Sequence, residues 1–207
     1  MDTFQLISRI ANKMNWLDFE QKLNKNGQRI FTPLDVARIM DKSEVAVRFF
    51  LHRYTKRGAL IYLKKGFYAL KAKMPGELEI ANKIYAPSYI SLEYALSFYK
   101  VIPETVYTVT SVTSKATREF TVSDIVYKYN KIRKDLFFGY QPIKKDNALI
   151  LVASPEKALV DYLYFVSLKK KSIPDRMSFR SLDRRKIYFY AKKFKRDSLV
   201  KIIKELL

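Results

Sequence analysis

The chain has no cysteine and a single histidine among its 207 residues. The absence of cysteine excludes a disulfide framework, a zinc site built from thiolates and a cysteine nucleophile. Its longest purely aliphatic run, ALILVA, is far shorter than the ~18 residues that a membrane-spanning helix requires. The amino-terminal stretch MDTFQLISRIANK lacks the apolar core of a signal peptide. We therefore expect a cytoplasmic protein that has no membrane partner.

Catalytic patterns are also scarce in this sequence. It contains neither a glycine-rich phosphate-binding loop nor a nucleophile elbow. Glu156 and Asp161 lie five positions apart in one predicted helix, but the helix dipole and a solvated helix face explain both. For His52, a DNA contact or an idle surface position is a better explanation than catalysis or metal binding. The sequence therefore predicts no enzyme, no catalytic residue, no cofactor and no metal site.

Positive charge, by contrast, is abundant. The chain carries 40 basic and 20 acidic residues, a net charge of +20. Residues 1–75 hold fifteen basic and six acidic groups, and residues 76–207 hold 25 and 14. Both parts would attract a polyanion, and nucleic acid is the polyanion that such a charge favours. An acidic protein or an anionic membrane surface is the weaker alternative.

Residues 43–70, SEVAVRFFLHRYTKRGALIYLKKGFYAL, predict a helix followed by a hairpin. The helix has one apolar face, formed by Val47, Phe50, Leu51 and Tyr54. Ser43 is a suitable N-cap, and Gly58 can adopt the left-handed conformation that ends a helix. ALIYL and FYALK are rich in strand-forming residues, and the KKG between them predicts a charged turn.

The preceding residues, RIFTPLDVARIM, predict a short strand and another helix. Thr32 is placed to cap this helix, with Pro33 at its first position and Asp35 at its third. Its expected apolar face consists of Leu34, Ala37 and Ile39 or Met40. DKS then forms a turn of the length found in a helix-turn-helix motif. A further helical stripe upstream comprises Ile7, Ile10, Ala11 and Met14.

The resulting order is helix, short strand, helix, turn, helix and hairpin, which predicts a winged helix-turn-helix DNA-binding domain over residues 1–75. In such a domain the second helix of the motif enters the major groove, and the hairpin meets phosphate or the minor groove. The predicted DNA-binding residues are Ser43, Val45, Arg48, Phe49, His52, Lys56, Arg57, Lys64 and Lys65. A small α+β domain that binds only protein is the alternative, because a fold alone does not determine function.

Pro75 and Gly76 mark a boundary, after which residues 76–207 predict a mixed α+β domain. YISLEYALSFY predicts a helix capped by Ser91, and SPEKALVDYLYFVSL predicts one capped by Ser154. Strands are expected in ETVYTVTSVTS, ATREFTV, IVYKYNKI, LFFGYQPI and NALILVAS. Two helices, at about 181–195 and 197–206, are expected to follow. The expected fold is α+β: a winged helix-turn-helix domain, then a mainly antiparallel sheet with carboxyl-terminal helices.

The tail, residues 169–207, holds fourteen basic and four acidic groups. Ile187, Tyr190, Ala191 and Phe194 predict the inner face of its first helix, so the basic side chains should point outward. They form a candidate extended basic surface: Lys169, Lys170, Lys171, Arg184, Arg185, Lys192, Lys193 and Arg196. A solvated face explains this pattern equally well, whereas a strip beside a winged helix would lengthen the DNA contact.

Three segments, YISLEYALSFYKVIPETVYTVTSVTS, FFGY and VASPEKALVDYLYF, resemble the AbiEi family of antitoxins from bacterial type IV toxin–antitoxin (abortive infection) systems. The resemblance spans about residues 28–168. It implies a winged-helix domain that binds inverted repeats in the promoter of its own operon and represses it. It also implies a second domain, here residues 76–207, that counters a partner toxin of the nucleotidyltransferase class. Lys100 stands where we expect a glycine.

Two other functions fit the same residues. A protein-interaction module could neutralise a toxin by direct contact, with its basic tail on an acidic partner. An RNA-binding protein could instead use the tail on the RNA target of the toxin. Binding to duplex DNA from upstream of its own operon distinguishes the antitoxin and repressor from both.

Overall fold

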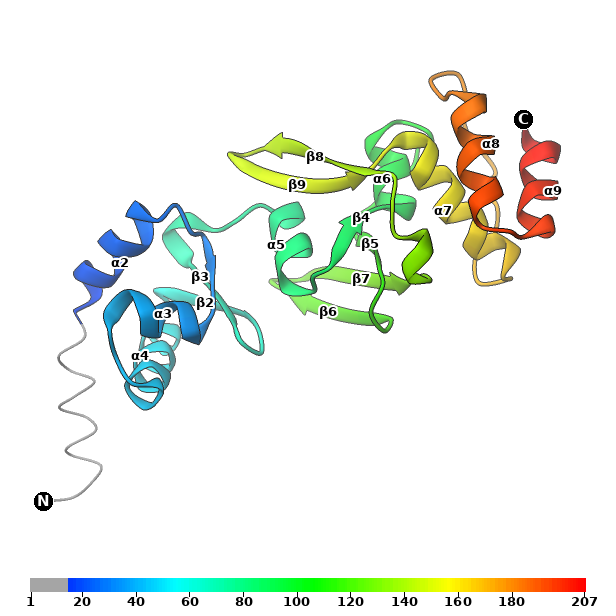
Figure 1. Ribbon diagram of the computed structural model, residues 1–207. Coiled ribbons are helices and arrows are strands. Elements are labelled where there is room, and N and C mark those ends of the chain that lie inside the picture. Colours follow the sequence, from blue (N-terminus) through cyan, green and yellow to red (C-terminus); the bar gives the residue numbers. More distant parts are fainter. Residues whose placement is uncertain (1–14) are drawn as a thin grey trace, which may run out of the picture. The chain divides into compact units, whose positions relative to one another are not determined.

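A computed structural model describes residues 15–207 of the chain. The described part is a mixed α+β structure with eight α-helices and two β-sheets (Figure 1). It divides into two compact units, unit 1 (Met1–Gly76) and unit 2 (Glu77–Leu207), next to the predicted boundary at Pro75 and Gly76. The helix predicted over Ile7–Met14 lies outside the described residues.

From residue 15 onward, unit 1 combines three α-helices with a small antiparallel sheet. The strand order of the sheet is β1–β3–β2, and both pairings are antiparallel. In chain order the elements are α2 (Trp16–Lys25), β1 (Ile30–Phe31), α3 (Pro33–Met40), α4 (Glu44–Lys56), β2 (Leu60–Lys64), β3 (Phe67–Leu70) and a 3-10 turn at Lys71–Lys73.

Helix α2 was not predicted, although it contributes to the core of unit 1. Asn15 caps it by accepting a hydrogen bond from the Leu17 N–H at 3.0 Å. Phe19 is fully buried, and its ring meets that of Phe50 edge-on at 5.1 Å. The Trp16 ring lies 4.5 Å from that of Tyr54. Aromatic pairs of this kind hold α2 against α4.

The predicted caps of α3 and α4 are confirmed. Thr32 and Asp35 form a reciprocal capping box, with the Asp35 N–H donating to the Thr32 hydroxyl at 3.2 Å. The Ser43 hydroxyl accepts the Ala46 N–H at 3.4 Å. Of the apolar face expected for α3, Met40 is buried and Ala37 and Ile39 pack against the core, as predicted. Leu34 was wrong, because it is 53% exposed, and the buried Val36 was missed.

Unit 2 is built on a six-stranded sheet with the order β6–β7–β5–β4–β9–β8. Its strands are β4 (Ser88–Ile90), β5 (Val109–Thr113), β6 (Arg118–Val122), β7 (Ile125–Lys131), β8 (Tyr140–Lys145) and β9 (Ala148–Ala153). Three pairings are antiparallel, but β5–β7 and β4–β9 are parallel. The sheet is therefore mixed, with antiparallel pairings in the majority.

Five helices accompany this sheet, of which α5 was not predicted. They are α5 (Glu77–Ile84), α6 (Leu92–Phe98), α7 (Pro155–Ser167), α8 (Arg184–Lys193) and α9 (Asp197–Leu206). Helices α6, α8 and α9 all pack against α7, and α5 packs on strands β4 and β9 (Figure 1). Helix α7 is enclosed as a result, and most of its side chains are buried. In residues 15–207, none of the helices has the length and apolar character needed to cross a membrane.

The end of α6 explains the expectation of a glycine at position 100. Lys100 has φ +57°, and the Val101 N–H bonds back to the Leu96 carbonyl at 2.8 Å. This arrangement places a left-handed residue after the helix, where glycine fits best because a Cβ costs energy there.

We expect Lys100→Gly to raise the free energy of unfolding by about 1 kcal/mol, because the left-handed strain disappears. Urea denaturation measures the shift. Lys144→Gly, at an exposed position in strand β8, is the control and should lower stability, because glycine weakens a strand. A lower midpoint for both variants would refute the assignment of strain to Lys100.

Candidate nucleic-acid interface

Helix α4 presents a mixed polar and apolar face to solvent. Its inner face buries Val47, Phe50 and Leu51, as predicted. On the outer face Val45 is 48% and Phe49 is 36% exposed. Arg48 and His52 are exposed as well, and the helical spacing of these four residues places them on one side. We call Val45, Arg48, Phe49 and His52 the α4 face.

Three elements of unit 1 converge beside Arg48. A cavity of about 410 Å³ is lined by Arg48 and Glu44 from α4, Leu34 from α3, and Gly66 and Tyr68 from the hairpin. The Arg48 side chain therefore lies at the junction of α3, α4 and the hairpin turn. A ligand at the α4 face would reach the hairpin as well.

The hairpin turn consists of Lys65 and Gly66, and Gly66 has φ +84°, which glycine tolerates without strain. Lys65 is exposed. Lys64 is half-buried, with its Nζ atom 5.4 Å from the centre of the Phe67 ring. The two lysines of the predicted wing tip thus differ: Lys65 is presented to solvent, and Lys64 is held along the hairpin.

The remaining predicted contacts lie at the two ends of α4. Lys56 and Arg57 are exposed at its carboxyl end, and the Arg57 guanidinium stands 5.6 Å from the centre of the Tyr54 ring. Cations at this end also stabilise the helix dipole, so their position does not by itself indicate DNA. Ser43 is exposed, but its hydroxyl is engaged as the cap. Of the nine predicted residues only Lys64 is not exposed.

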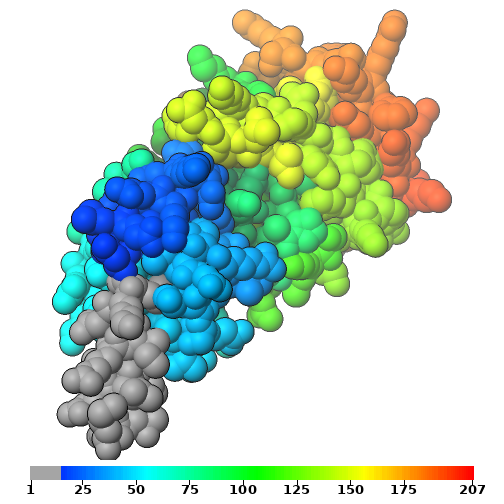
Figure 2. All heavy atoms as spheres, turned by 60° about the vertical axis from the view of Figure 1, so that its left-hand side comes forward, coloured from blue at the N-terminus to red at the C-terminus, as the bar shows by residue number. Residues whose placement is uncertain are grey.

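The eight residues of the predicted extended basic surface all belong to unit 2, and two of them have structural roles. Lys171 pairs with Glu93. Arg196 is half-buried and donates to the hydroxyl and the carbonyl of Ser167, each at 2.8 Å. The other six are exposed: Lys169, Lys170, Arg184, Arg185, Lys192 and Lys193. In the space-filling view, long side chains project from the orange carboxyl-terminal region (Figure 2).

Unit 2 also contains a buried polar cluster that the sequence analysis missed. Lys157 and Asp161, one turn apart on α7, form a fully buried ion pair. The Tyr89 and Ser91 hydroxyls each donate to the Asp161 carboxylate at 2.9 Å. The Lys157 ammonium also donates to the Tyr89 hydroxyl at 2.9 Å. Ser91 precedes α6 as predicted, but its hydroxyl serves this cluster and makes no capping bond.

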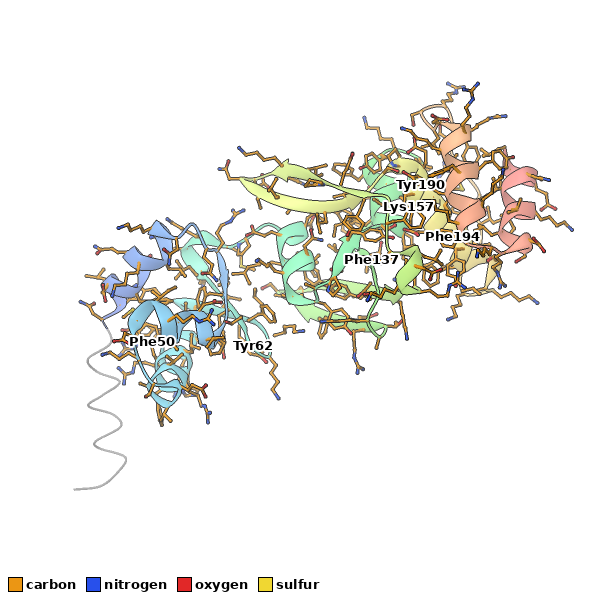
Figure 3. All side chains as sticks on the ribbon, in the orientation of Figure 1. Phe50, Tyr62, Phe137, Lys157, Tyr190 and Phe194 are labelled. Atoms are coloured by element: carbon orange, nitrogen blue, oxygen red, sulfur yellow. The ribbon has the colours of Figure 1, made fainter. Side chains whose placement is uncertain are left out.

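Burial dominates the electrostatics of the cluster. It lowers the pKa of Lys157, and the charge and hydrogen bond of Asp161 oppose that shift. Burial raises the pKa of Asp161. Burial also raises the pKa of Tyr89, and the charge of Asp161 raises it further. Figure 3 shows Lys157 close to Phe194, whose ring centre lies 5.2 Å from the ammonium. A cluster so enclosed ties α7 to β4 and has no access to a substrate.

Glu156 lies in the first turn of α7, where the helix dipole favours it, but the solvated face expected for Asp161 was wrong, because Asp161 is fully buried. The two residues do not form a shared acid site. Glu156 accepts a hydrogen bond from the Asp183 N–H at 3.3 Å, whereas Asp161 faces Lys157. In residues 15–207, no three histidine, cysteine, aspartate or glutamate side chains lie together in a way that could hold a metal ion.

Models of known protein families give no match to the chain, and a comparison with curated proteins finds no significant match. The resemblance to the AbiEi family therefore stays a prediction.

Proposed function

We propose that unit 1 is a winged helix-turn-helix that binds duplex DNA upstream of its own operon and represses transcription. The observation that carries this proposal is the α4 face, with Arg48 exposed between Val45 and Phe49. A helix that buries one side and exposes such a face matches the recognition helix of these domains. The element order of unit 1, the β1–β3–β2 sheet and the basic hairpin turn are consistent with it.

Each group has a role that follows from its chemistry. Arg48 would donate two hydrogen bonds to a guanine edge, and Val45 and Phe49 would contact thymine methyl groups. Lys65 at the turn, with Lys56 and Arg57 at the end of α4, would neutralise phosphates and fix the orientation of the domain. The resemblance to bacterial AbiEi antitoxins supports the proposal that the protein acts in the cytoplasm.

We expect the purified full chain to shift the DNA from directly upstream of its operon in a gel, and to shift scrambled DNA of equal composition more weakly. If the protein neutralises about six phosphates, the logarithm of the affinity should fall with the logarithm of salt concentration at a slope near −5. The double variant Lys64→Ala and Lys65→Ala should weaken binding to both DNAs alike and make the slope shallower by up to about 2.

Lys144→Ala and Lys145→Ala, in β8 of unit 2, remove the same charge from two neighbouring lysines that are both exposed, and serve as the control. A salt-independent affinity, or equal affinity for upstream and scrambled DNA, would argue against an operator-binding repressor and for a protein partner.

We also propose, from the resemblance to AbiEi antitoxins, that unit 2 counters a partner toxin of the nucleotidyltransferase class. Co-expression of the chain with the product of the neighbouring reading frame tests this role. Restored growth is the expected result. Growth restored equally by a chain in which unit 2 is unfolded would assign the antidote to repression alone.

A further inference from the structure

Helix α8 lies within the most basic stretch of the chain. Residues 184–196, RRKIYFYAKKFKR, contain seven basic residues and no acidic one. The helix buries Ile187 and Ala191 toward the rest of unit 2. Its outer side carries Arg184, Arg185, Lys186, Phe189, Lys192 and Lys193, all exposed. We call these six residues the α8 surface.

Several charges of α8 lie where they lower the stability of the helix. Arg184, Arg185 and Lys186 occupy the first turn, where the positive end of the helix dipole disfavours cations. The chain places acidic residues at this position in α7, with Glu156, and in α9, with Asp197. In α8 only the cap residue Asp183 is acidic, and it accepts the N–H groups of Arg185 and Lys186. Three cations at this end lower the stability of the helix, and bound anionic groups would offset that cost.

Aromatic rings lie among these cations. Phe189 is 57% exposed, and its ring centre is 5.7 Å from that of Tyr190. Tyr190 in turn is 5.7 Å from Phe138, which precedes β8. The Lys193 ammonium stands 4.5 Å from the centre of the Phe189 ring and 4.7 Å from that of Phe138. The α8 surface therefore presents an exposed ring with a cation beside it, at the edge of a small aromatic cluster.

We propose that the α8 surface binds single-stranded nucleic acid, with an unpaired base stacked on Phe189 and its phosphates on the surrounding arginines and lysines. Alternating aromatic and basic side chains recognise single strands because every unpaired base offers a flat face. The bases of a duplex are already stacked on each other, so an exposed ring on an outward-facing helix gains little from duplex DNA. The charges alone would also attract an acidic peptide, but a carboxylate-rich chain has no use for the exposed ring.

The binding test uses the full chain and fluorescence anisotropy with labelled oligo(dT) and oligo(U), each of about 20 nucleotides, and a labelled duplex of equal length. We expect Phe189→Ala to weaken single-strand binding at least about fivefold, the loss of one stacked base, and to leave duplex binding unchanged. Phe189→Trp should restore it. Phe98→Ala is the control, because it removes another ring of unit 2 that is 44% exposed. It should change neither single-strand binding nor duplex binding. Oligo(dT) and oligo(U) differ in the 5-methyl group of the base as well as in the sugar, so oligo(dU), which has the base of oligo(U), is measured beside them to identify the sugar.

Phe189→Trp provides a second readout, because a base stacked on the new indole should quench its fluorescence. The signal of the single native tryptophan, Trp16, is subtracted with the wild-type protein. The proposal is overturned if Phe189→Ala leaves single-strand affinity unchanged, if it weakens duplex binding by the same factor, or if polyglutamate competes as well as oligo(dT). Loss of operator binding in Arg48→Ala, with single-strand binding intact, would bear only on unit 1.

Discussion

Replacing Asp161 with alanine is expected to lower the free energy of unfolding by about 3–5 kcal/mol, because it leaves the Lys157 ammonium buried without its counter-charge. Both side chains are fully buried, and Asp161 also accepts hydrogen bonds from Tyr89 and Ser91. The variant therefore leaves three buried donors without this acceptor: the Lys157 ammonium and the hydroxyls of Tyr89 and Ser91. Urea denaturation followed by circular dichroism measures the loss, which is a large fraction of the about 5–15 kcal/mol that stabilises a typical folded protein.

Two further variants identify the cause of that loss. Glu119→Ala breaks an exposed pair with Lys128, whose N–O distance is 3.6 Å, and should cost less than about 1 kcal/mol. The double variant Lys157→Met and Asp161→Leu removes both buried charges and should recover much of the stability lost in Asp161→Ala. If Asp161→Ala matched Glu119→Ala in stability, the buried pair would not be what holds α7 in place.

Gly139, in the segment FFGY, packs against the side chain of the buried Lys157. A Cβ at this position would lie 2.9 Å from the Cγ atom of Lys157, and the residue has φ +76°. Glycine therefore lets the chain before β8 lie directly on the buried stem of Lys157. FFGY and SPEKALVDYLY are far apart in the sequence, but Gly139 and Lys157 are in contact. Two of the segments that carry the family resemblance thus meet in one packing contact.

Local signals made part of this fold predictable. Helices α4 and α7 each have a serine cap, an apolar stripe and a defined end, so residues within about fifteen positions determine them. Helix α2 was missed because its sequence, WLDFEQKLNK, is short, buries only Phe19 and Leu23, and has its apolar Leu17 exposed. Strand β4 has three residues, and its position in the middle of the sheet depends on partners from β5 and β9. Parallel neighbours are not joined by a short turn, so the sequence contains no local signal that predicts their pairing.

In the candidate sites, too, features set by nearby residues are predictable and features set by distant partners are not. The exposure of Arg48 and His52 follows from helical periodicity alone, since they lie opposite the buried stripe of α4. The pairing of Lys171 with Glu93 joins residues 78 positions apart, so the sequence could not show that this lysine is engaged. The Lys157–Asp161 pair left only an ambiguous signal, because two opposite charges one turn apart in a mostly apolar helix can be buried, whereas the same spacing in Asp18–Lys22 is exposed.

Arg48→Ala is expected to reduce discrimination between operator and random DNA by about 1–3 kcal/mol, if the guanidinium binds a guanine edge in both hydrogen-bonding positions. The side chain is exposed and is not part of the buried stripe of Val47, Phe50 and Leu51, so the fold should keep its stability. Competition gel shifts with operator and random duplexes at fixed salt measure the discrimination, and a urea melt verifies the fold. Arg38→Ala, which removes an exposed arginine from α3, should leave discrimination unchanged because that helix does not carry the α4 face. Equal weakening on both duplexes by Arg48→Ala would instead assign this guanidinium to a phosphate, and specificity would then have to come from Val45, Phe49 and His52.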